Sequence, residues 1–209
     1  MRRVADAARI RLADPGCRPN ALVIITRDKE EMIAALRRKY PVLFLDAANE
    51  SIRIPRQRGP VTAWHLEGRV DRMGSPVPFN EDEGYYVLNT PVTPSRISAT
   101  MRPIFLGAVV VIEVDALIGL TTTQIADYAA MRAFAKTDPA RVRKSKVPTI
   151  LTVLDAPMDS EVPLTLTQWD MGYLKGLYAA PENHNAYTQL GEIRRGLTRE
   201  LKEGEPGEP

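Results

Sequence analysis

The sequence predicts an α+β fold with a mixed β-sheet and a helical C-terminal half, and two observations carry this prediction. The first is an apolar strand at residues 21–26 that is followed directly by a helix. The second is segment 108–137, in which a β-branched strand, a short connection and an amphipathic helix follow one another. Strand–helix units favour parallel pairing, so a purely antiparallel sheet is not expected. Helical patterns dominate after residue 137.

Length and composition limit the classes of protein to which the chain can belong. Its 209 residues fit one domain, which we place at 1–202, followed by a polar, disordered tail at 203–209. A hydrophobic content of 44% with 26% charged residues is typical of a globular protein with a core. The formal net charge of +2 is too small to indicate nucleic acid or an anionic membrane as partner. The single cysteine, Cys17, excludes an intramolecular disulfide and is expected to be a small buried apolar group.

Hydropathy predicts no membrane-spanning segment. The chain contains no run of about 20 apolar residues, which a transmembrane helix needs. Its first 30 residues also lack the apolar core of a signal peptide. We therefore expect a cytoplasmic protein, or a periplasmic or otherwise extracytoplasmic one if a signal peptide was removed before residue 1.

The N-terminal half is predicted to contain three strands and one helix. Residues 21–26 read as a buried strand, and Asp28 then serves as the N-cap of the helix. Residues 61–66 alternate and predict a second strand. Residues 68–83 are rich in glycine, proline and acidic side chains and are expected to be a long hairpin connection. Residues 85–89 are then the returning strand.

The two histidines of the chain, His65 and His184, are far apart in sequence. His65 lies on the opposite face of its strand from Trp64 and Leu66. No second histidine, cysteine or carboxylate stands at ligand spacing on that strand. We expect His65 to be structural or exposed, and we expect neither a metal site nor a cofactor.

The clearest local signal is a strand that leads into a capped helix. Residues 108–114 contain five β-branched side chains, which is typical of a strand buried on both faces. Gly119 marks the turn. Thr121 is then a good N-cap, and Gln124 stands three residues later, at the spacing of a capping box.

Three side chains of this helix are candidates for a cleft. Gln124 and Tyr128 are four residues apart and therefore lie on one face. Asp127 lies on the neighbouring face with Met131 and Phe134, which is unusual for a solvated carboxylate. Asp127 either pairs with an arginine or caps a nearby backbone, or it is a polar group held in a cleft.

The next long helix contributes three further candidates. Thr167 is its predicted start, with Asp170 at the capping-box spacing. Trp169 and Tyr173 belong to a broad apolar and aromatic side of this helix. Such a side forms either core or the lining of a cleft.

A run of cations precedes this helix and consists of Arg141, Arg143, Lys144 and Lys146. Binding of single-stranded nucleic acid uses aromatic side chains among the charges. None is present here, so a solvated loop is favoured and no nucleic-acid partner is expected. Residues 148–154 fit either a strand or a helix, and a last helix extends to about residue 202.

The motifs of several enzyme classes are absent. The chain contains no HExxH, no GxSxG, no GxGxxG and no phosphate-binding glycine loop. Cys17 has no histidine close in sequence that would form a nucleophilic pair with it.

Three segments resemble a group of uncharacterised envelope proteins of alphaproteobacteria. They are CRPNALVIIT, GLTTTQIADYAAMRAFA and LTQWDMGYLKGLYAAPENHNAYTQLGEI. Members of that group carry the similar segments "GLT…Q-ADY-AM--LA" and "LT-WD--YL-GLY", usually have a secretory signal, and are related to zincin-like metallopeptidase folds. The resemblance spans most of residues 17–196.

The resemblance implies a zincin-like scaffold without a metal site. A zincin carries its HExxH motif on a helix that follows a strand. In this chain Gln124, Ile125 and Tyr128 stand where His, Glu and His would be. Gln and Tyr are poor zinc ligands, and Ile cannot act as a general base.

These observations leave three hypotheses for function. The first is a non-catalytic, envelope-located domain on an inactive metallopeptidase-like scaffold that binds a peptide or protein beside helix 121–137. Its cleft residues would be Gln124, Asp127, Tyr128, Trp169, Asp170 and Tyr173, unless all six only cap and pack the two helices. The second is a metal-independent hydrolase that uses a carboxylate of the same cleft, Glu113, Asp127 or Asp170. The third is a cytoplasmic regulatory or nucleic-acid-binding domain that uses residues 141–146.

Overall fold

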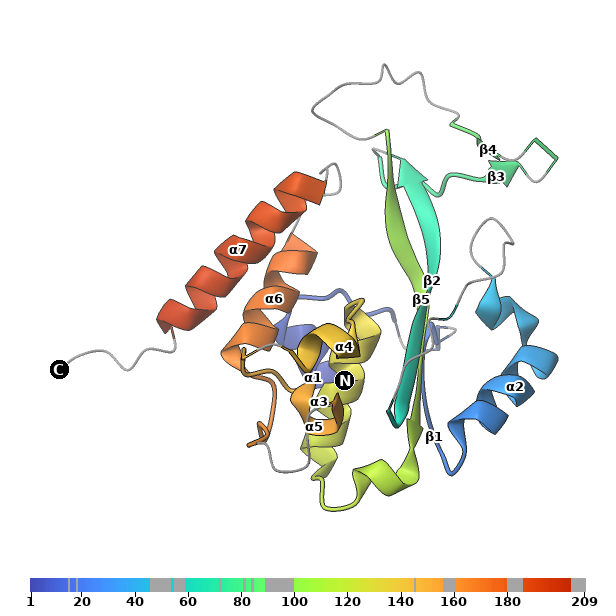
Figure 1. Ribbon diagram of the computed structural model, residues 1–209. Helices are drawn as coiled ribbons and strands as arrows, with labels where there is room; N and C mark the ends of the chain where they lie inside the picture. Colours follow the sequence, from blue (N-terminus) through green and yellow to red (C-terminus); the bar gives the residue numbers. More distant parts are fainter. Residues whose placement is uncertain are drawn as a thin grey trace.

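A small β-sheet lies between one helix on one side and a group of helices on the other (Figure 1). This arrangement is seen in a computed structural model of the chain. The residues that it describes are 1–14, 16–17, 19–45, 54, 59–71, 73–80, 82–83, 85–88, 100–144, 146–155, 161–179 and 186–203. No helix within these ranges is long and apolar enough to cross a lipid bilayer.

The sheet has three strands, and the longest, β5 (Met101–Glu113), lies in the middle. β1 (Ala21–Thr26) pairs with β5 in parallel, and β2 (Val61–Asp71) pairs with its other side antiparallel. The predicted mixed sheet is therefore confirmed. After β1 the chain passes through α2 (Lys29–Lys39) and η1 (Pro41–Phe44), and the Asp28 carboxylate caps α2 as predicted.

Apolar side chains cover both faces of β5, as its β-branched run predicts. One cluster joins β5 to α2 and contains the buried residues Leu36, Phe44, Trp64, Val109 and Val111. The other joins β5 to α3 (Thr122–Phe134) and includes Ala108, Val110 and Ile112. Successive residues of a strand point to opposite faces, so one strand supplies both clusters.

The strand predicted at residues 21–26 has the expected range, but its predicted burial is wrong. Val23 and Ile25 are 36% and 51% exposed. β1 is an edge strand, and the apolar cluster beneath α2 covers only the face that carries Leu22 and Ile24. A short apolar run does not by itself distinguish a central strand from an edge strand.

The predicted hairpin connection at residues 68–83 is also wrong. β2 continues to Asp71 and pairs with β5 along its length, with one irregularity between Leu66 and Glu67. β5 itself is therefore the returning strand. Tyr85–Tyr86 (β4), which we predicted to return along β2, pairs instead with Phe79–Asn80 (β3) in a separate two-stranded sheet. The alternation of apolar and polar residues within one strand does not reveal which distant strand pairs with it.

The second half of the chain is helical, as predicted. Its elements are η2 (Val114–Leu117), α3, α4 (Pro139–Val142), α5 (Thr152–Asp155), α6 (Gln168–Ala179) and α7 (Ala186–Glu203). Residues 148–154, which fitted either a strand or a helix, are irregular or turn up to Leu151 and enter α5 only at Thr152. The predicted tail is described only at Glu203, which ends α7; residues 204–209 lie outside the described ranges.

α6 and α7 lie side by side because glycines allow their backbones to approach (Figure 1). A Cβ atom at Gly176 would lie 2.5 Å from the Ile193 Cα, and one at Gly196 would lie 2.4 Å from the Gly172 carbonyl oxygen. Both distances are shorter than a carbon atom tolerates, so larger side chains at these positions would push the helices apart.

At the N-terminus, α1 (Arg2–Ala7) packs on the helical side of the sheet through Val4 and Ala8. Cys17 is exposed, so the prediction that it is buried is wrong. It lies in the stretch between α1 and β1, where hydrophobicity of a single residue does not decide burial.

Candidate functional site

The start of α3 is held by the capping box that the sequence predicts. Gln124 N–H donates to the Thr121 hydroxyl at 3.2 Å, and Thr121 N–H donates to the Gln124 side-chain oxygen at 3.0 Å. Gln124 Nε2 also donates to the Pro163 carbonyl at 3.0 Å. Gln124 therefore uses both ends of its amide to fix the helix start and the loop before α6.

Asp127 is 1% exposed and is tied to two distant segments. Its carboxylate accepts hydrogen bonds from Arg3 Nη2 at 2.5 Å, from the Thr165 hydroxyl at 2.6 Å and from Leu166 N–H at 3.2 Å. Of the two roles considered for Asp127, the structure shows the structural one, since it both pairs with an arginine and binds backbone. These contacts join α1 and the loop before α6 to the middle of α3.

Tyr128 is fully buried in the core beneath α3. Its ring lies 6.0 Å from the guanidinium carbon of Arg132, one turn further along the helix. The face that Gln124 and Tyr128 share is therefore directed into the protein.

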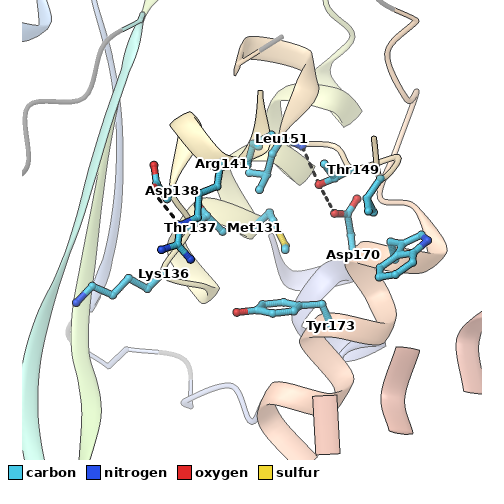
Figure 2. A pocket seen from close by; sticks show the side chains of 12 residues that line it. Met131, Lys136, Thr137, Asp138, Arg141, Thr149, Leu151, Asp170 and Tyr173 are labelled. Carbon is cyan, nitrogen blue, oxygen red and sulfur yellow. Dashed lines mark hydrogen bonds and ion pairs between the residues drawn. The ribbon is translucent and has the colours of Figure 1, made fainter. Parts of the chain in front are cut away.

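A cavity of about 330 Å³ lies between the C-terminal end of α3 and the first turns of α6 (Figure 2). Its walls are mainly apolar and aromatic, and they include Met131, Val142, Val147, Leu151, Trp169 and Tyr173. Of the six predicted cleft residues, Trp169, Asp170 and Tyr173 line this cavity, whereas Gln124, Asp127 and Tyr128 do not. The cavity lies at the C-terminal end of α3, where Met131 lines it, whereas Gln124, Asp127 and Tyr128 stand earlier on this helix.

Asp170 holds the cavity wall together. Its carboxylate accepts hydrogen bonds from the Thr149 hydroxyl at 2.5 Å and from Ile150 N–H at 2.8 Å. It also accepts from Thr167 N–H at 2.9 Å, which completes the predicted cap of α6. Asp170 is 2% exposed, so these protein donors surround a carboxylate with little access to solvent.

Polar groups at the cavity rim come from the end of α3 and from α4. Lys136 Nζ lies 2.6 Å from a Glu67 carboxylate oxygen, and Arg141 Nε lies 3.6 Å from an Asp138 oxygen. Thr137 lines the cavity, and its buried hydroxyl has no hydrogen-bond partner within the described part of the chain.

Tyr173 projects from α6 toward the rim residues (Figure 2). Burial raises the pKa of the Tyr173 hydroxyl, so the phenol stays neutral at physiological pH. Together with the Thr137 hydroxyl, it can form a hydrogen bond to a bound group. The arrangement is that of a binding pocket with apolar walls and few polar atoms.

His65 has a structural role, in agreement with the prediction. It is 7% exposed, its Nε2 donates to the Ala133 carbonyl at 3.1 Å, and its ring stacks on Phe105 with 4.3 Å between centroids. Burial lowers the pKa of His65, an effect that the Ala133 hydrogen bond opposes. The residue joins β2 to the end of α3 from which Lys136 and Thr137 reach the cavity.

No protein-family model matches the chain, and no curated protein or solved structure matches it either. The resemblance to envelope proteins and to zincin-like folds therefore stays a prediction.

Sequence reasoning missed the residues that the cavity receives from the end of α3 and from segment 141–151. These residues are Met131, Lys136, Thr137, Asp138, Arg141, Val142, Val147, Thr149 and Leu151. One signal was present, because apolar Val142 and Val147 interrupt and end the run of cations. In the described part of the chain, no group of three or more His, Cys, Asp and Glu side chains is placed to hold a metal ion.

Proposed function

We propose that this chain is a non-catalytic binding domain that takes an apolar side chain of a peptide or protein partner into the cavity between α3 and α6. The composition of the cavity supports this proposal most directly. Six apolar or aromatic residues surround a volume of about 330 Å³. That volume is near the lower end for ligand pockets and suits one large side chain. The neutral hydroxyls of Thr137 and Tyr173 would orient the bound group.

The charged groups of the cavity favour binding over catalysis. A general acid or base must reach the proton that it transfers. The Asp170 carboxylate instead accepts hydrogen bonds from Thr149, Ile150 and Thr167, and Asp138 is paired with Arg141. Both oxygens of Asp170 are therefore occupied by protein donors, and Asp138 has a cation beside it.

The alternative hydrolase receives less support. Asp127 does not line the cavity and is occupied by Arg3 and by the loop before α6. Glu113 lies at the end of β5 and accepts a hydrogen bond from Lys29 N–H at 3.5 Å. The three carboxylates considered for acid–base chemistry thus have separate structural partners.

The metallopeptidase-like scaffold is a second, finer part of the proposal. It is supported by the order of strand and helix and by the short motifs on α3 and α6. Gln124 and Tyr128, at the positions of the metal-binding histidines in the resemblance, serve the helix cap and the core. A scaffold of this kind would bind its partner at the C-terminal end of α3, whereas a zincin binds its metal near the start of the corresponding helix.

Panning of a random-peptide phage library against the full chain tests the proposed binding function. Fluorescence anisotropy of the selected peptides then gives their affinities. Val142→Trp places a large ring in the cavity and is expected to weaken binding at least tenfold, because ring and ligand compete for one volume. Val42→Trp is the matched control, since Val42 is 64% exposed and does not line the cavity.

Two results would contradict the proposal. One is that panning selects no peptide. The other is that the Val142→Trp variant binds the selected peptides as tightly as the unmodified chain does.

A further inference from the structure

A run of exposed cations lies in sequence between two residues that line the cavity. Arg141, Val142 and Val147 line the cavity, and the chain between them carries Arg143, Lys144 and Lys146. All three of these cations are exposed. None of them forms an ion pair with a carboxylate in the described ranges.

The two cations of the cavity lining differ from these three. Lys136 is paired with Glu67, and Arg141 is paired with Asp138. The excess of positive charge therefore lies between two residues of the apolar wall in sequence, Val142 and Val147.

We infer that the partner is an acidic peptide segment in which aspartate or glutamate flanks an apolar anchor side chain. This inference rests on the proposed function, because the anchor needs the cavity. The charge of this run supports it: an extended peptide advances about 3.3 Å per residue, so the neighbours of the anchor reach the cations of segment 143–146. Complementary charge at the rim of an interface increases association rate and specificity.

An acidic peptide explains these features better than a nucleic acid does. Single-stranded nucleic acid is bound by bases stacked on accessible aromatic faces among the cations. Here Trp169 and Tyr173 are partly buried and line the cavity together with aliphatic side chains and Met131. The segment that carries the charges contains no aromatic residue.

The test uses the full chain, the phage-selected peptides and a charge-reversed variant, Arg143→Glu/Lys144→Glu/Lys146→Glu. We expect the selected peptides to be enriched in acidic residues beside an apolar one. The variant should weaken their binding on the order of tenfold, since each of three exposed pairs contributes a factor of about 1.4 to 5. Raising NaCl from about 50 to about 500 mM should also weaken binding of these peptides to the unmodified chain, because salt screens the exposed charges.

A matched control carries the same change of charge elsewhere. Arg194→Glu/Arg199→Glu/Lys202→Glu alters exposed residues of α7 and is expected to leave peptide binding within twofold. Indole, a small uncharged probe, is titrated into both variants and followed by chemical-shift changes of the Trp169 side chain. Equal indole binding shows that the cavity is intact in both.

The outcomes separate this inference from the proposed function. If the first charge-reversed variant binds the peptides normally while Val142→Trp abolishes binding, the acidic partner is wrong and the proposed function stands. If Val142→Trp has no effect, both are wrong. If a single-stranded oligothymidylate displaces the peptides at comparable concentration, and charge reversal removes its binding, a nucleic acid replaces the peptide as partner.

Discussion

The carboxylate of Asp170 on α6 accepts a hydrogen bond from the amide of Ile150, at 2.8 Å and 20 residues earlier in the sequence. The same carboxylate caps its own helix through Thr167. One side chain thus begins α6 and attaches to it the segment that forms a wall of the cavity.

Asp170→Ala is expected to destabilise the protein by about 3 kcal/mol, because it leaves the buried Thr149 hydroxyl and the Ile150 amide without acceptors. Urea unfolding followed by circular dichroism measures this loss. Asp115→Ala, at an exposed aspartate of η2, should change stability by no more than about 0.5 kcal/mol. A loss below about 1 kcal/mol for Asp170→Ala would show that other contacts hold this wall.

The ion pair between Arg3 and Asp127 predicts that its two alanine substitutions lower the stability of the protein by unequal amounts. Asp127 is almost completely buried, whereas the Arg3 side chain is 62% exposed. Asp127→Ala should cost about 2–3 kcal/mol, because Thr165 and the Leu166 amide lose their acceptor as well. Arg3→Ala should cost about 1 kcal/mol, since those two donors still stabilise the carboxylate.

A double-mutant cycle on the two residues measures their coupling. Equal losses for the two single variants would contradict the asymmetry. Asp6→Ala, which removes an exposed carboxylate of α1, is the control for a general effect of charge.

The close approach of α6 and α7 predicts opposite effects for two glycine substitutions. Gly176→Ala places a methyl group 2.5 Å from the Ile193 Cα and should destabilise the pair of helices by about 1–3 kcal/mol. Gly191→Ala meets no atom within 4 Å and should stabilise α7 by about 0.5–1 kcal/mol. Limited proteolysis and thermal unfolding report both changes. If Gly176→Ala stabilised the protein, the close approach of α6 and α7 at this residue would be contradicted.

Protonation of His65 should make stability depend on pH. Burial holds the pKa of His65 below its ordinary value of 6.5, so the unfolded chain binds this proton at higher pH than the folded chain. The contribution of neutral His65 is complete above about pH 6.5 and is lost as the pH falls through the folded-state pKa. Urea unfolding between about pH 7.5 and 5 measures the slope of the unfolding free energy against pH.

His65→Gln is expected to flatten this pH dependence, because glutamine keeps an N–H donor for the Ala133 carbonyl and does not titrate. An unchanged slope in His65→Gln would assign the pH dependence to other groups.

The parts of the site that could be predicted are those that depend on neighbours in sequence. The two helix caps at Thr121 and Thr167 were predicted from a spacing of three residues, and the structure contains both. The arginine partner expected as one possibility for Asp127 was also found, but its identity as Arg3 was not predictable. The two positions are 124 residues apart, and no local pattern connects them.

The cavity itself was not predictable because its walls come from separate segments. Leu151 and Trp169 face one space only after Asp170 has attached segment 149–150 to α6. The run of cations was interpreted as a solvated loop; its side chains are exposed, but Arg141 lies in the short helix α4 and not in a loop. What composition could not show is that Val142 within the run and Val147 after it line a cavity.

The sequence by itself determined the α+β class, the mixed sheet, the central strand and the capped helices, because periodicity, β-branching and capping act over a few residues. Only the tertiary structure decided which strand lies at the edge, that β2 and β5 pair beyond the predicted hairpin, and that Asp127 and Asp170 are buried connectors. These properties arise from contacts between residues far apart in the chain, and such contacts exist only once the topology has brought the segments together.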